Sequence, residues 1–144
     1  IIVSCAGDPG VAEAKQAVPI PVIGGGASTA ALSTFFGSYP AVLGITEDVP
    51  ESYHRILGNR IVNNAKGDGV ENILDLMTAK GYEATMEKAA AQKALGADVI
   101  ALSCTGMSSI QIASSIEKAV GIPVLDPVMC EGLLTVFELL RKEI

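Results

Sequence analysis

Short apolar segments alternate along the chain with longer segments in which apolar residues recur at helical spacing. The clearest apolar run lies at residues 97–102, where Ala-Asp-Val-Ile-Ala-Leu ends abruptly in Ser-Cys-Thr-Gly. Such a run is typical of a buried parallel strand that presents side chains at its carboxyl end. Because strands and helices alternate throughout, the pattern predicts an α/β fold in which helices cover both faces of a parallel sheet.

The same criteria predict the other elements. Further strands are expected at residues 1–3, 20–23, 41–46, 60–63 and 122–125, and helices at residues 11–18, 27–36, 51–57, 70–80, 83–95, 108–120 and 127–142. Asp8 before Pro9 is expected to cap the first helix, and Asp126 before Pro127 to cap the last. The glycines at 24–26 lack the spacing of a phosphate-binding loop, and we interpret them as a flexible connection.

The first residues already read as a strand. A buried strand needs neighbours on both edges, and Ile1 has no preceding turn. We therefore expect further sequence before Ile1.

Two segments of the chain resemble each other. Ser-Cys-Ala-Gly at 4–7 matches Ser-Cys-Thr-Gly at 103–106, and the segment 17–22 matches the segment 119–124. Both matches occur in the same order around a strand, a loop, a helix and a strand, which indicates a duplicated unit.

The duplication suggests a specific chemistry. Functional groups gather beyond the carboxyl ends of parallel strands, so two units packed face to face would place Cys5 and Cys104 on opposite walls of one cleft. Inversion of a carbon centre needs a base on one face and an acid on the other. A thiolate and a thiol can serve, because the ordinary thiol pKa of about 8.5 is close to neutrality. A helix is predicted directly after each cysteine, and its N-terminus would lower the thiol pKa.

Composition narrows the range of partners. The 144 residues carry a net charge of -6 without a cluster of Lys and Arg, which argues against nucleic acid and anionic membranes. No apolar run reaches the roughly 20 residues of a membrane helix, and no leader-like segment is present. The three cysteines are widely spaced, so neither a disulfide framework nor a metal site is indicated. We expect a cytoplasmic protein that acts on a small-molecule substrate.

Three stretches resemble the aspartate/glutamate/hydantoin racemase superfamily, and the hydantoin racemase branch in particular. They are the loops at 4–10 and 103–107 and the strand at 122–126. The likeness extends over essentially the whole chain. It implies two pseudo-symmetric parallel-sheet domains and a homo-oligomer.

The resemblance also implies where the domains divide. The first domain would comprise residues 1–37 and 127–144 and would be truncated at its amino end, and the second would comprise residues 38–126.

By the same resemblance Cys5 and Cys104 would be the catalytic acid/base residues, without pyridoxal phosphate or metal. The implied substrate-binding residues are Ala6, Gly7, Thr46, Thr105 and Gly106. The chain departs from glutamate and aspartate racemases, which tend to carry Cys-Asn-Thr at the first cysteine, and it lacks a second Thr soon after position 46. These departures favour a hydantoin-like or other unusual substrate over a plain amino acid.

Other functions stay open on the sequence. One is an isomerase or decarboxylase of the same fold that uses one cysteine as nucleophile and the other as acid. Another is a non-catalytic module whose cysteines line a binding pocket. We interpret Cys130 as a core residue and His54 as a surface residue. Glu47 and Asp48 are expected in a solvated loop, with a place at the border of the cleft as the alternative.

Overall fold

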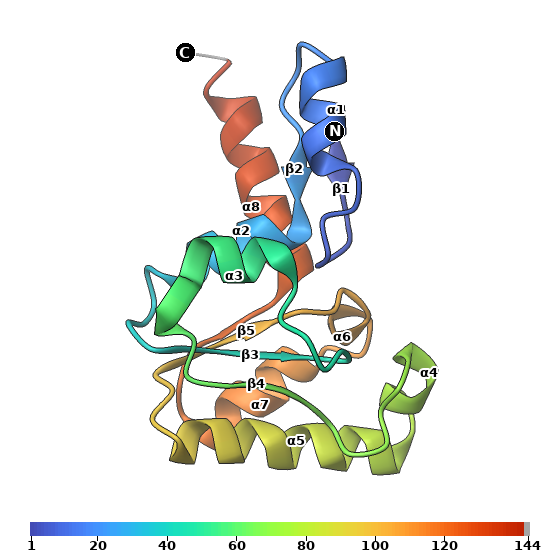
Figure 1. Ribbon diagram of the computed structural model, residues 1–144, viewed down its shortest axis with the longest axis vertical. Coiled ribbons are helices and arrows are strands. Elements are labelled where there is room, and N and C mark those ends of the chain that lie inside the picture. Colours follow the sequence, from blue (N-terminus) through green and yellow to red (C-terminus); the bar gives the residue numbers. More distant parts are fainter. Residues whose placement is uncertain (143–144) are drawn as a thin grey trace.

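The larger part of the molecule is built around a four-stranded parallel sheet. In the computed structural model, which describes residues 1–142, its strands are ordered β4-β3-β5-β6 (Figure 1). Their bounds are Pro40–Gly44 for β3, Asn64–Lys66 for β4, Val99–Leu102 for β5 and Val124–Leu125 for β6. Each neighbouring pair is parallel, so all four carboxyl ends lie at one edge.

Helices cover both faces of this sheet, as predicted. One face carries α5 (Ala79–Ala94) and α7 (Ile112–Val120), and the other carries α2 (Gly25–Ser33) and α3 (Glu51–Leu57) (Figure 1). The α/β class with parallel sheets is therefore confirmed.

A second, smaller sheet lies beyond α2. It pairs β1 (Ile2–Val3) with β2 (Ile23–Gly24) in parallel, with α1 (Val11–Ala17) between them in sequence and α8 (Pro127–Leu140) beside β2. Ile1 and Ile2 are about half exposed, at 53% and 47%.

The division of the chain into two domains, 1–37 with 127–144 and 38–126, remains a prediction.

The short elements are η1 (Gly58–Arg60), α4 (Ile73–Leu76) and α6 (Gly106–Ser109).

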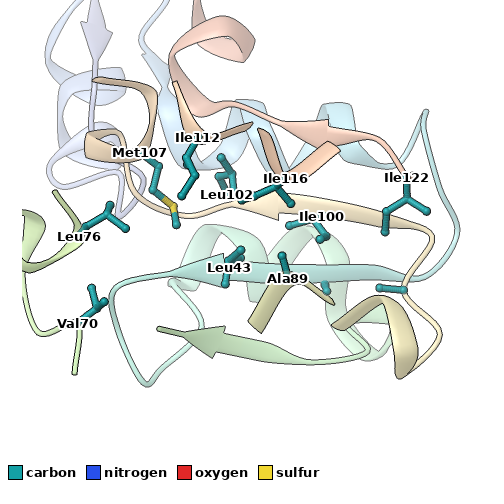
Figure 2. Packing of buried hydrophobic residues seen from close by; sticks show 12 residues of the cluster. Leu43, Val70, Leu76, Ala89, Ile100, Leu102, Met107, Ile112, Ile116 and Ile122 are labelled. Carbon is teal, nitrogen blue, oxygen red and sulfur yellow. The ribbon is translucent and has the colours of Figure 1, made fainter. Parts of the chain in front are cut away.

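The two central strands bury alternate side chains in two separate clusters. Ile100 and Leu102 of β5 pack with Ile112 of α7 (Figure 2), whereas Ala101 packs with Tyr53 of α3. This alternation follows from the two-residue period of a strand, and a strand covered on both faces is apolar throughout. Each fully buried large aliphatic side chain contributes roughly 1.5–3 kcal/mol to the burial free energy, so the apolar run holds the residues after Leu102 in a fixed place.

Several element boundaries differ from those predicted. The strand expected at 60–63 lies at 64–66, because residues 58–60 form a 3-10 helix first. The helix expected at 70–80 is divided: α4 ends at Leu76, and α5 begins after Thr78, whose hydroxyl accepts from the Gly81 backbone N–H at 3.0 Å. The helix expected at 108–120 begins at Gly106 and is interrupted at Gln111, which has a φ of 52°.

Asp8 caps a different helix from the one predicted. The first helix, α1, has Gly10 as its N-cap without a side-chain hydrogen bond. Asp8 instead accepts from the backbone N–H groups of Gly26 and Ala27, at 2.9 and 2.7 Å, in the first turn of α2. The side chain thus satisfies two free amides of a helix that begins 17 residues later in the chain, as a carboxylate at a helix N-terminus can.

The glycines at 24–26 are buried, so the prediction of a flexible connection is wrong. Gly24 ends β2, and Gly25 and Gly26 open α2. The prediction for Asp126 is confirmed, because its carboxylate accepts from the backbone N–H groups of Val128 and Met129 at the start of α8.

Candidate active site

One cleft brings the two cysteine loops together. It has a volume of about 450 Å³ and is lined by the loop that leaves β1 and the loop that joins β5 to α6. Its wall also includes the loop that follows β3, the strand next to β5. These loops all leave the carboxyl ends of parallel strands, where α/β proteins place their sites.

The cleft contains all but one of the residues that the sequence singled out. They are Cys5, Ala6, Gly7, Thr46, Cys104 and Thr105. Gly106 does not line the cleft and is the first residue of α6. A Cβ at Gly106 would overlap the Ile73 side chain of α4, so glycine lets α4 pack against this loop.

The loop that carries Cys5 is tied to the start of α2. The backbone N–H of Asp8 donates to the Cys5 carbonyl at 3.0 Å, and the Asp8 side chain holds the first turn of α2. Within the loop Ala6 is buried, whereas Cys5 is exposed to the cleft. A Cβ at Gly26 would overlap the Ala6 carbonyl oxygen, so only glycine allows this close approach. Backbone contacts therefore fix the position of the Cys5 loop.

Cys104 is half-buried, and its surroundings act on its pKa in both directions. Burial raises the pKa of the Cys104 thiol most, and the backbone N–H groups of Gly106 and Met107 lower it by hydrogen bonding to sulfur. A charge on Cys5, which lines the same cleft, raises the Cys104 pKa slightly further. Because the net pKa is above the ordinary value, Cys104 is a thiol at neutral pH.

The expectation that a helix N-terminus lowers both thiol pKa values is thus wrong for Cys104, where burial outweighs the two amides. The helix predicted after Cys5 is α1, which begins at Val11, six residues after the cysteine.

The loop after β3 forms the wall beside Thr46. The Thr46 hydroxyl donates to the Asp48 carbonyl at 2.9 Å, and the Asn64 side chain of β4 donates to the Glu47 carbonyl at 2.8 Å. Glu47 also pairs with Lys66 at 3.1 Å, and its side chain is 81% exposed, so this ion pair adds little stability. Glu47 and Asp48 are both exposed, as predicted.

Several cleft residues were missed by the sequence reasoning. They are Ile45, Val49, Pro50 and Ser103. Asp48 lines the cleft as well, in agreement with the alternative that its loop borders the cleft, whereas Glu47 does not line it. Three of the missed residues follow β3, and their place could have been inferred only from the pairing of β3 with β5.

Other candidate groups lie outside the cleft. Cys130 is buried on α8, where burial raises the pKa of its thiol to about 11, and His54 is exposed on α3; both agree with their predicted roles. Within residues 1–142, no three His, Cys, Asp or Glu side chains converge as a metal site requires. No helix in that range has the length and apolar content of a membrane span.

The alkylation of Cys104 by iodoacetamide is expected to be slow at pH 7. Its rate is expected to rise with pH, and the midpoint of that rise is expected to lie above the ordinary thiol pKa. The thiolate is the reactive form, and a raised pKa leaves little of it at neutral pH. Replacement of Cys5 by serine removes the charge that raises the Cys104 pKa, so the midpoint is expected to fall. Mass spectrometry of each cysteine peptide at successive pH values measures this, with the Cys130 peptide as the slow reference. A midpoint for Cys104 at or below about 8.5 would contradict the conclusion that burial raises the pKa of this thiol.

Comparison with known proteins extends this description. A family model described as Asp/Glu/Hydantoin racemase matches residues 1–131. The hydantoin racemase of Paenarthrobacter aurescens is 27% identical over 133 residues, which cover 88% of this chain and 56% of that protein. The hydantoin racemase of Pseudomonas sp. (strain NS671) is 28% identical over 141 residues, which cover 89% and 53%. The chain thus spans about half the length of these relatives.

Solved structures share the fold. The allantoin racemase of Pseudomonas fluorescens superposes with a TM-score of 0.80 at 22% identity, covering 99% of this chain and 62% of that one. The allantoin racemase of Klebsiella pneumoniae superposes with a TM-score of 0.73 at 22% identity, covering 94% and 59%.

Proposed function

Because the chain belongs to the Asp/Glu/hydantoin racemase family, we propose that the protein inverts a carbon next to a carbonyl group, with Cys5 and Cys104 as its two proton-transfer groups. The observation that carries the proposal is the cleft that both cysteine loops line, one from each copy of the repeated motif. A cleft of about 450 Å³ is of the size that holds a small molecule.

The proposed reaction needs one thiolate and one thiol at the start. The thiolate takes the proton from the stereogenic carbon, which leaves a planar carbanion delocalised onto the carbonyl oxygen. The thiol on the opposite wall then gives its proton to the other face of that carbon. One turnover therefore exchanges the protonation states of Cys5 and Cys104, and the reverse reaction restores them.

The environment of Cys104 suits the acid in this scheme. Its raised pKa keeps the proton on sulfur until the carbanion forms. Once the proton has left, the Gly106 and Met107 amides stabilise the new thiolate, so the same group can act as base in the reverse direction.

The cleft favours an uncharged ring over a free amino acid. Among the described residues, its lining includes no Lys or Arg, and its one charged side chain is the acidic Asp48. A free amino acid would place its carboxylate there without a cationic partner. A hydantoin carries no such carboxylate, and allantoin is itself a hydantoin with a ureido group on its stereogenic carbon. The names of the relatives agree with this substrate class.

In D2O, the whole protein is expected to racemise one enantiomer of a 5-substituted hydantoin and to incorporate one deuterium per inverted molecule, without added cofactor. The donor thiol exchanges its proton with solvent between turnovers, whereas the unreacted enantiomer keeps its hydrogen early in the reaction. Polarimetry gives the rate, and chiral separation with mass spectrometry locates the label.

The controls are a blank without protein and a parallel assay with glutamate, which is expected not to turn over. Loss of optical rotation no faster than in the blank would contradict the proposed function. A covalent adduct on either cysteine would favour nucleophilic catalysis by a related isomerase or decarboxylase.

A further inference from the structure

We infer that the Ser103 hydroxyl donates a hydrogen bond to the substrate carbonyl oxygen that gains negative charge during proton removal. The inference rests on the proposed function. It concerns a residue that directly precedes Cys104 and lines the same cleft as both cysteines.

The Ser103 hydroxyl is buried without a partner. The residue is 7% exposed, and its Oγ makes no hydrogen bond within residues 1–142. A buried hydroxyl without a partner costs free energy, and such groups in native proteins call for an explanation. A ligand oxygen bound in the cleft would supply the missing acceptor.

The backbone fixes the direction of this side chain. The Ser103 N–H donates to the Leu43 carbonyl at 2.8 Å, which continues the pairing of β5 with β3. The two-residue period then places Ser103 on the same face as Ala101. Ala101 packs in one cluster with Ala6, the residue after Cys5, so the hydroxyl lies on the side of the sheet that faces the Cys5 loop.

A glycine on the neighbouring strand makes room for the hydroxyl. A Cβ at Gly44 would overlap Ser103 Oγ, and Gly44 does not have the positive φ that would by itself require glycine. Glycine at the end of a strand often marks a close approach by another group. The absence of a side chain at Gly44 therefore leaves the room in which the Ser103 hydroxyl lies.

The Ser103 hydroxyl is expected to accelerate the chemical step, which is the removal of the proton from the substrate. The carbonyl oxygen of the substrate becomes more negative as the proton leaves, so a fixed donor stabilises the transition state more than the bound substrate. Ser103 would then affect kcat more than KM. Its counterpart in the sequence repeat, Ser4, is exposed and does not line the cleft, which makes Ser4 a matched control.

The test compares Ser103→Ala with Ser4→Ala in the whole protein, by hydantoin racemisation and thermal unfolding. Ser103→Ala is expected to lower kcat about ten- to a hundredfold, in line with the loss of one donor to a developing charge. Its melting temperature is expected to be unchanged or higher, because the hydroxyl has no partner in the free protein. Ser4→Ala is expected to match the unsubstituted protein in both measurements.

Wild-type kcat in an active Ser103→Ala protein would overturn the role of Ser103 and leave the proposed function standing. A lower kcat together with a lower melting temperature would also overturn it, since that pair of results indicates a structural role. An unsubstituted protein that does not racemise the hydantoin would overturn the proposed function itself.

Discussion

Replacement of Cys104 by serine is expected to lower the rate of racemisation by about a thousandfold or more, and replacement of Cys5 by serine is expected to do the same. A serine hydroxyl is a far weaker acid than a thiol, so it can neither hold the negative charge nor deliver the proton at neutral pH. Loss of a positioned acid or base typically costs 10²–10⁴-fold, and here one partner of an obligatory pair is lost. Polarimetry on a single hydantoin enantiomer measures the effect.

The two variants are expected to differ in what they retain. Each keeps one thiol on one wall of the cleft, so each should still exchange the proton of one enantiomer with D2O, and the preferred enantiomer should be opposite in the two variants. Cys130→Ala is the matched control, because Cys130 is buried on α8 outside the cleft. Full racemisation by either serine variant would contradict the two-cysteine mechanism.

The second large effect is expected from Gly26→Ala. The added methyl group would overlap the backbone carbonyl of Ala6 and lie within 2.5 Å of the Ser52 hydroxyl oxygen. A backbone atom cannot rotate away as a side chain can, so either the Cys5 loop or the start of α2 must shift. Overpacking of this kind costs about 1–3 kcal/mol of unfolding free energy. We also expect racemisation to fall by about a hundredfold, because small displacements of a reacting group are costly.

Gly132→Ala is the matched control for Gly26→Ala. Gly132 lies within α8, and a Cβ there would meet no atom within 4 Å, so the substitution should raise the unfolding free energy through helix propensity. Denaturant unfolding and the racemisation assay, run on both variants, separate the two effects. A Gly26→Ala protein with unchanged stability and activity would show that the Cys5 loop is not held by this contact.

Much of the fold follows from signals that are local in the sequence. The helix α3 spans Glu51–Leu57, as predicted, because Pro50 and Gly58 mark its two ends. The strand β5 is predicted because it is buried on both faces and apolar throughout, and Cys104 is placed by that strand. The duplicated Ser-Cys motif predicts both cysteines of the cleft without any knowledge of distances.

Other features depend on contacts between distant parts of the chain. Asp8 has the sequence signature of a local cap, yet its carboxylate accepts from the first turn of α2, a contact between segments 17 residues apart that the local sequence does not reveal. The direction of the Cys104 pKa shift depends on how deeply the folded chain buries the thiol, which no motif encodes. The role of Ser103 depends on the lateral neighbour Gly44, and strand pairing is not visible in the sequence around Cys104.

The burial of Cys104 also has a consequence for the chemical lifetime of the protein. Peroxides and other oxidants attack thiolates much faster than thiols, and oxidation beyond sulfenic acid is in most proteins irreversible. At neutral pH the raised pKa keeps Cys104 mostly in the less reactive form. The same desolvation that raises the Cys104 pKa therefore slows oxidative damage to this sulfur at neutral pH.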